Sequence, residues 1–97
     1  MPTYIAMLKW TSQGLQNIKQ SPSRLEAARK GFEAAGAKMK DFYMVTGHYD
    51  MIAVVDAPDD ATLAKALLGA TSQGNITSET CRAFSEAEYR KIISGLP

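Results

Sequence analysis

Cysteine and histidine are almost absent from this chain, which has one of each, Cys81 and His48, in 97 residues. A single cysteine excludes an intrachain disulfide and any metal site built from clustered cysteines. One histidine and scattered carboxylates are too few ligands for a zinc site. Glycine-rich phosphate-binding loops are missing as well. We therefore expect neither a metal nor a cofactor.

An excess of charge of either sign is also missing. Eleven Lys and Arg residues face ten Asp and Glu residues, which gives a formal net charge of +1. Binding to nucleic acid or to an anionic membrane surface needs a basic footprint. The opening "MPTYIAMLKW" is too short and alternating for a transmembrane span, and it lacks the basic leader of a signal peptide. These absences predict a cytoplasmic protein with no nucleic-acid or membrane partner.

Four segments have the composition of β-strands and lie at residues 3–10, 38–46, 49–56 and 75–84. Only the Gly47-His48 region separates the second from the third, which predicts an antiparallel hairpin. Helices over 21–36 and 57–74 alternate with the strands, and a short helix over 85–96 follows. The order β-α-β-β-α-β predicts an α+β fold of the ferredoxin-like type, with a four-stranded antiparallel sheet and a C-terminal helix. We expect a single domain over residues 1–97.

The helix ends are marked by residues that favour caps and stops. Ser21 can cap the first helix, Pro22 suits its first position, and Gly36 ends it. Asp59 or Asp60 can cap the second helix, which Gly74 ends, and Ser85 and Glu88 have the spacing of a capping box before the last helix. The connector over 11–20 is expected to be irregular, with one helical turn. The residues expected to face inward are Leu25, Ala28, Phe32, Ala35, Leu63, Leu67 and Ala70.

The predicted strands carry apolar residues on both faces. Ile52 and Val54 alternate with Met51, Ala53 and Val55 in the third strand. Two helices can cover only one face of such a sheet, and a face exposed to water normally alternates apolar with polar residues. A small domain also leaves much of its surface wet, so association is common. The pattern predicts a homodimer through the helix-free face, or a higher oligomer. The alternative is a monomer with an exposed apolar sheet.

The segment "VTGHYDM" at 45–51 has two interpretations. In the first it is only a turn, in which Gly47 adopts positive φ, Asp50 bonds nearby backbone donors and Tyr49 packs its ring. In the second it also lines a ligand site, because antiparallel pairing brings the end of strand one beside the start of strand three. Ile76 and Thr77 of strand four lie on the other side. Such a mixed wall suits a small polar or aromatic molecule. The candidate ligand-binding residues are Lys9, Trp10, Thr11, His48, Tyr49 and Asp50.

Catalytic residues cannot be assigned from the sequence. His48 is the candidate acid–base residue and could form a dyad with Asp50, but it lies in a turn with no nucleophile spaced to serve it. Cys81 is expected to be an inert residue inside a strand. Arg82 is expected near Tyr4, in a structural ion pair.

Four stretches, "PTYIAMLKWT", "SPSRLEAARK", "DFYMVTGHYDMIAVVDAPDD" and "SETCRAFSEAEYRKII", resemble the GYD-domain family, named after a Gly-x-Tyr-Asp tetrapeptide that is here Gly47 to Asp50. The resemblance implies a dimeric α+β barrel, in which two ferredoxin-like sheets face each other. A looser similarity links residues 46–84 to the effector-binding half of Lrp/AsnC-type regulators, which bind small amino acids at subunit contacts. The chain departs from those regulators because it has no helix-turn-helix segment.

Two functions follow from these expectations. The first is a small-molecule-binding or assembly domain without catalytic activity, whose partner is a second copy of itself. The second, by analogy of fold, is a cofactor-independent enzyme of the barrel monooxygenase or isomerase type. Fold analogy is a weak warrant for function. A roomy interior with convergent polar groups would favour binding or catalysis, and a filled interior would favour a structural role.

Overall fold

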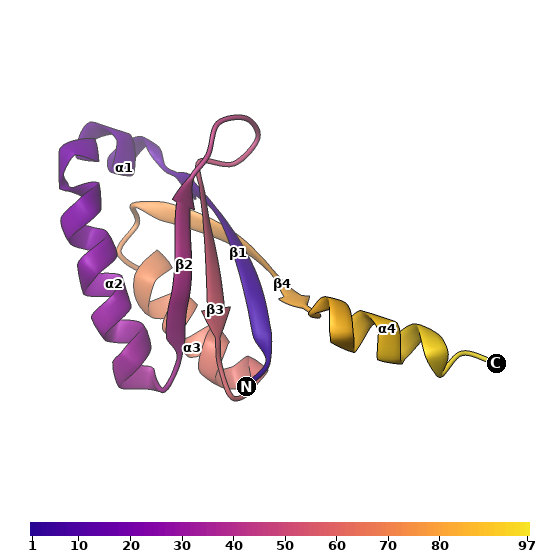
Figure 1. Ribbon diagram of the computed structural model, residues 1–97. Helices are drawn as coiled ribbons and strands as arrows, with labels where there is room; N and C mark the ends of the chain where they lie inside the picture. The colour runs from indigo at the N-terminus through magenta and orange to yellow at the C-terminus, as the bar shows by residue number, and fades with distance from the viewer.

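A four-stranded antiparallel sheet with two long helices on one face forms the body of the protein (Figure 1), seen in a computed structural model that describes residues 1–97. The strand order is β2-β3-β1-β4, so β2 and β4 are the edges. This arrangement confirms the predicted ferredoxin-like α+β fold. The elements in chain order are β1 (Thr3–Trp10), α1 (Ser12–Gln16), the 3-10 helix η1 (Ile18–Gln20), α2 (Ser21–Ala35), β2 (Lys38–Met44), β3 (Met51–Asp56), α3 (Asp60–Thr71), β4 (Ile76–Ala83) and α4 (Glu86–Ser94).

The connector after β1 is more helical than predicted. It contains α1 and then η1, which runs directly into α2. The prediction that Ser21 caps α2 was therefore wrong: Gln20 precedes the helix, and no side chain caps it. A preceding helical turn already occupies the backbone where a cap would act. The other end is as predicted, because Gly36 has φ +95° and closes α2.

The hairpin between β2 and β3 is antiparallel as predicted, but its strands are shorter than the sequence indicated. β2 ends at Met44 and β3 begins at Met51, which leaves residues 45–50, here called the GHYD loop, between them. The amide of Val45 donates to the carbonyl of Asp50 at 2.8 Å and closes the loop. The Asp50 amide bonds outside the hairpin, because it donates to the carbonyl of Leu8 in β1 at 2.9 Å. The loop is thus tied to the neighbouring strand as well as to its own.

The later helices have the predicted N-terminal caps, but α3 ends at Thr71, three residues before the predicted Gly74. The Asp59 carboxylate accepts from the Thr62 amide at 2.8 Å at the start of α3. Ser85 and Glu88 form the capping box of α4, with bonds of 3.1 and 2.9 Å. These backbone N–H bonds favour the charged carboxylates, so the pKa of Asp59 and the pKa of Glu88 both lie below their ordinary values.

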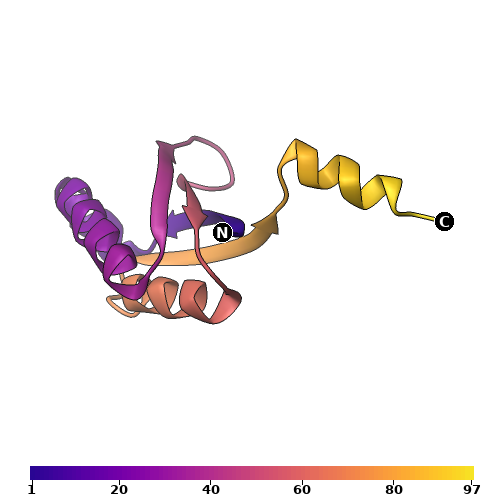
Figure 2. The same ribbon diagram turned by 60° about the horizontal axis from the view of Figure 1, so that its bottom comes forward.

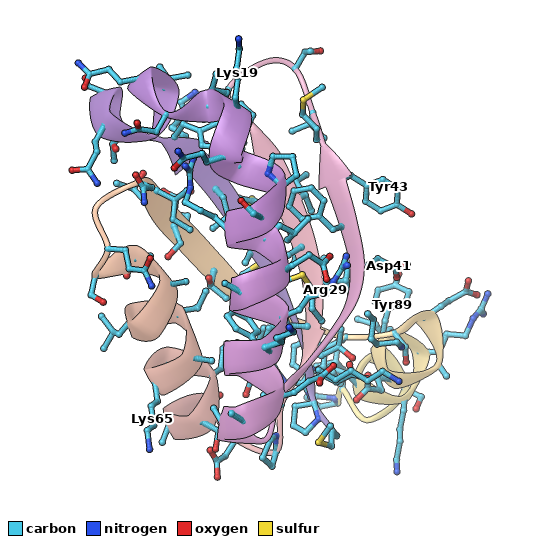
Figure 3. The ribbon with its side chains drawn as sticks, turned by 90° about the vertical axis from the view of Figure 1, so that its left-hand side faces the viewer. Lys19, Arg29, Asp41, Tyr43, Lys65 and Tyr89 are labelled. Carbon is cyan, nitrogen blue, oxygen red and sulfur yellow. The ribbon has the colours of Figure 1, made fainter.

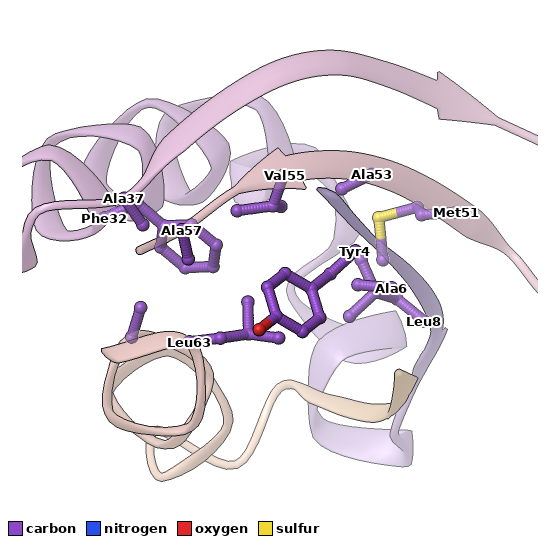
Figure 4. Packing of buried hydrophobic residues seen from close by; sticks show 11 residues of the cluster. Tyr4, Ala6, Leu8, Phe32, Ala37, Met51, Ala53, Val55, Ala57 and Leu63 are labelled. Atoms are coloured by element: carbon purple, nitrogen blue, oxygen red, sulfur yellow. The ribbon is translucent and has the colours of Figure 1, made fainter. Parts of the chain in front are cut away.

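The core lies between one face of the sheet and helices α2 and α3 (Figures 3 and 4). Alternate residues of β1 and β3 point into it, and Phe32 of α2 and Leu63 of α3 pack from the other side. Both helix residues were predicted to face inward. Many of the core side chains are small, so this face holds only a thin core. The buried residues are Tyr4, Ala6, Leu8, Phe32, Ala37, Met51, Ala53, Val55, Ala57, Leu63 and Ala66.

Helix α4 projects away from the body at the end of β4 (Figures 1 and 2). It gives the chain extents of 52 × 31 × 17 Å and a radius of gyration of 14.7 Å, against about 13 Å for a compact chain of this size. A nine-residue helix is marginal in water without packing. Exposed apolar side chains lie along it and on either side of it, at Phe84, Tyr89, Ile92, Ile93 and Leu96. None of the helices has the length and apolar composition that a bilayer crossing requires.

Candidate functional site

The sheet face opposite α2 and α3, here called the open face, carries a continuous apolar strip. The register places Ile5 beside Val54 and Met7 beside Ile52 at the centre of the sheet. Cys81 of β4 lies beside Ile5, and Tyr43 of β2 lies beside Ile52. No helix covers this face (Figure 2). We call Ile5, Met7, Ile52 and Val54 the apolar strip; each is only partly buried in the single chain.

The GHYD loop is fixed by Gly47 and Asp50. Gly47 has φ +121°, which L side chains rarely adopt. The Asp50 carboxylate accepts a hydrogen bond from the backbone amide of Trp10 at 3.0 Å. Together with the Asp50–Leu8 backbone bond, this contact holds the loop against the end of β1. The turn interpretation of the motif therefore accounts for two of its four residues.

Tyr49 lies on the open face and contacts β4. Its hydroxyl donates to the carboxylate of Glu79. This bond, with desolvation and the negative charge of Glu79, raises the pKa of Tyr49 above its ordinary value. The ring of Tyr49 meets the His48 ring edge-on at 4.8 Å between centroids, and the Lys9 ammonium lies 5.9 Å from its centroid. An ammonium, an imidazole, a phenol and a carboxylate thus gather at one corner of the open face.

A hollow of about 140 Å³, here called the GHYD hollow, opens at this corner. It could hold a small polar molecule between the Lys9 ammonium and the Glu79 carboxylate, with the Tyr49 ring as a wall. Its lining residues are Met7, Lys9, His48, Tyr49, Thr77, Ser78 and Glu79. Sequence reasoning missed Glu79. The sequence placed only Ile76 and Thr77 of strand four at this end, and the register that puts Glu79 beside Met7 is seen only in the structure.

The six candidate ligand-binding residues share one end of the sheet but divide between its two faces. Lys9, His48 and Tyr49 come together at the GHYD hollow on the open face. Trp10 packs against the core on the helix side. The Thr11 hydroxyl accepts from the Gly14 amide at 3.1 Å as the cap of α1, and it donates to the Gly74 carbonyl at 2.6 Å. Asp50 links the two groups through its bond to the Trp10 amide.

His48 and Asp50 do not form a dyad. The Asp50 carboxylate is engaged by the Trp10 amide, and His48 makes no hydrogen bond within the chain. A general base must be held in place and partly desolvated. Nowhere in the chain do three or more His, Cys, Asp or Glu side chains gather in a way that could hold a metal ion.

Arg82 lies where the sequence predicted, at the far end of the sheet beside Tyr4. Its guanidinium is 5.8 Å from the Tyr4 ring centroid and 4.5 Å from the Phe84 ring centroid, and it pairs with Glu88 at 3.7 Å. The ion pair joins the base of α4 to the sheet. Cys81 lies one residue away with its side chain exposed on the open face.

Comparison with known proteins identifies the family of the chain. Residues 4–93 match the model of the GYD domain. The chain belongs to the GYD-domain family. This GYD-domain chain is 33% identical over 89 residues to a Thermus thermophilus protein named glutamine synthetase and cystathionine beta-lyase binding protein. The alignment covers 91% of this chain and 94% of that protein.

Solved structures confirm the fold of this GYD domain. MtbAldR superposes with a TM-score of 0.68 at 15% identity, over 88% of this chain, which spans about half (52%) of that protein. TTHA0845 from Thermus thermophilus gives 0.56 at 23% identity, over 88% of this chain and 95% of that one. FFRP-DM1 gives 0.58 at 17% identity, over 87% and 100%. At such identities these solved structures show the fold alone.

Substitution of Gly47 tests the turn. Gly47→Val should lower the free energy of unfolding by about 1–3 kcal/mol, because the left-handed φ strains a β-branched residue. No atom lies within 4 Å of the added Cβ, so the cost comes from the backbone alone. Gly69→Ala is the control: its Cβ also meets open space, in the last turn of α3, where alanine favours the helix. Urea denaturation of both variants gives the comparison. An unchanged midpoint for Gly47→Val would show that the loop is not strained.

Proposed function

We propose that this GYD-domain protein is a binding and assembly domain without catalytic activity, and that two copies join through their open faces. The observation that carries the proposal is the apolar strip, which lies at the centre of a sheet face with no helix over it. Contiguous exposed apolar surface of this kind is rare on monomers. At about 25 cal/mol per Å², burying several hundred Å² contributes on the order of 10 kcal/mol before association costs. The same face of a second copy is complementary to it by symmetry.

The rim of the open face is polar, as expected for an interface with an apolar centre. At one end Thr3 donates to Asp56 at 2.9 Å, and Lys40 pairs with Asp56 at 3.7 Å. At the other end lie Lys9 and Glu79, beside the GHYD hollow. Polar groups at both ends fix the orientation of two facing sheets better than an apolar surface alone.

Helix α4 supports self-association independently. Its apolar side chains, Tyr89, Ile92 and Ile93, are about half exposed and have no cover within their own chain. The helix leaves the body at the edge strand β4 (Figure 2), so a facing copy would lie within its reach. Packing against that copy would supply the contacts that a helix of this length needs.

Two observations support the proposed binding partners, the GHYD hollow and the Thermus thermophilus relative. A second sheet facing the first would enclose the hollow beside Tyr49, and a small polar or aromatic molecule would then contact Lys9, His48 and Tyr49. The name of the relative supports protein partners too, and we extend that proposal to glutamine synthetase and cystathionine beta-lyase of this chain's own organism. Such a role suits the cytoplasm.

The mass of the purified protein tests the assembly. Light scattering at micromolar concentration should give twice the chain mass of 10.5 kDa, or a higher multiple. A sample that shows only the 10.5 kDa species would remove the basis for the proposal. Sedimentation of the same sample mixed with purified glutamine synthetase or cystathionine beta-lyase then tests the protein partners. Binding is shown if this protein sediments together with the enzyme, and separate sedimentation of the two would contradict it.

A further inference from the structure

A second hollow lies on the other side of the sheet, under the N-terminal end of α2. Its volume is about 280 Å³, and its walls come from the end of β1, the β2–β3 hairpin and the first turns of α2. Figure 3 shows α2 and β2 side by side at this edge of the molecule. A narrower space of about 70 Å³ adjoins it and leads inward between α2 and the sheet. We call the two together the Trp10 pocket, and the residues common to both are Trp10, Ser21, Leu25, Phe42 and Met51.

The wall of the outer hollow is apolar with two polar exceptions. The indole Nε1–H of Trp10 is shielded from solvent and has no hydrogen-bond acceptor. Buried donors in proteins nearly always have a partner, so this one calls for an explanation. The second exception, the Ser21 side chain, lines both spaces and makes no hydrogen bond within the chain. No charged side chain lines the outer hollow.

We propose that the Trp10 pocket binds an uncharged, mainly apolar small molecule that carries one hydrogen-bond acceptor, with the Trp10 indole N–H as the donor. A charged ligand would find no counter-ion there. Arg24 reaches only the inner space, and its guanidinium is occupied by the carbonyls of Asn17 at 2.9 Å and Gly14 at 3.4 Å. The site lies on the opposite face from the GHYD hollow and does not depend on the proposed dimer.

The GHYD loop fixes the backbone on one side of the Trp10 pocket. The Asp50 carboxylate holds the Trp10 backbone amide, and the next residue, Met51, lines the pocket. Met51 lies opposite Met44 across the hairpin, and Met44 is 69% exposed at the mouth. Methionine side chains are flexible, so this pair can yield to an entering ligand and open a path to the indole nitrogen. Asp50 is thus a positioning residue for Trp10 rather than a ligand contact.

The single tryptophan makes the test direct, because a ¹⁵N-labelled sample has only one indole N–H resonance. The probes are acetophenone and ethylbenzene, which have similar shapes but of which only the first has an acceptor. Acetophenone should shift the indole proton downfield and saturably, and ethylbenzene should bind roughly tenfold more weakly, as expected for the loss of one hydrogen bond. Equal affinities for the two probes would overturn the role of the indole donor.

Two variants locate the binding. Met44→Lys and Ile18→Lys, at exposed positions on the mouth, should each abolish the acetophenone response. Leu68→Lys, at an exposed position of α3 that lines neither space, should keep it. No saturable shift in the parent, or an undiminished shift in both variants at the mouth, would overturn the site. An indole shift that depends on protein concentration without any probe would show that a second copy fills the pocket, and would overturn it equally.

Discussion

Replacing Ile52 by lysine is expected to convert the protein from a dimer to a monomer. Ile52 lies at the centre of the open face, beside Met7 of β1 and Tyr43 of β2. In a pair of facing sheets, an ammonium at this position would be removed from water among the side chains of the apolar strip. The expected cost is roughly 3 kcal/mol, or about 100-fold in dimer affinity. The symmetry of the contact introduces the charge twice, which adds to the effect.

The matched control for Ile52→Lys is Leu68→Lys. Leu68 is 66% exposed on α3, on the helix side of the sheet, so the same charge there should leave the dimer intact. Light scattering across a dilution series measures both variants, and circular dichroism checks that each is folded. A folded Ile52→Lys variant that still has twice the chain mass would place the interface elsewhere on the protein. Dissociation of the Leu68→Lys variant would assign the interface to the helical side.

The sequence predicted the two-faced sheet but could not say which face belongs to the core. Both alternating sets of β1 residues are apolar, so the alternation does not show which set faces the core. The structure decides this through packing: Tyr4, Ala6 and Leu8 meet the helices, and Ile5 and Met7 are left on the open face. Both sets are apolar because each packs against another surface. One set packs against the helices, and the other, in our proposal, packs against a second copy.

The same ambiguity explains why the candidate site divided. Lys9 and Trp10 are neighbours in the chain, and strand topology correctly placed both beside the GHYD loop. Successive side chains of a strand point to opposite faces. They therefore belong to different hollows, Lys9 to the one beside Tyr49 and Trp10 to the one under α2. Topology predicted which end of the sheet carries the residues, and only the register and packing showed that two surfaces meet there.

Gly14 is the position where the smallest substitution should have the largest effect on stability. It is buried in α1, and a Cβ added there would lie 2.1 Å from the Asn75 carbonyl oxygen. That oxygen belongs to the backbone and already accepts from the Thr11 amide at 3.0 Å, so it cannot move aside without breaking the contact between the end of β1 and the start of β4. Gly14→Ala should therefore lower the free energy of unfolding by about 3 kcal/mol, the upper end for overpacking by one methyl group.

Gly31→Ala is the same chemical change, but it is expected to raise the free energy of unfolding. Gly31 lies within α2, and no atom is within 4 Å of its added Cβ. Alanine in a helix is favoured over glycine, so this variant should gain roughly 0.5–1 kcal/mol. Urea denaturation of the two variants measures both effects, which have opposite signs. Equal stabilities would mean that α1 does not pack against the α3–β4 connection. That packing brings the end of β1 beside the start of β4, the junction at which the GHYD hollow and the Trp10 pocket both lie.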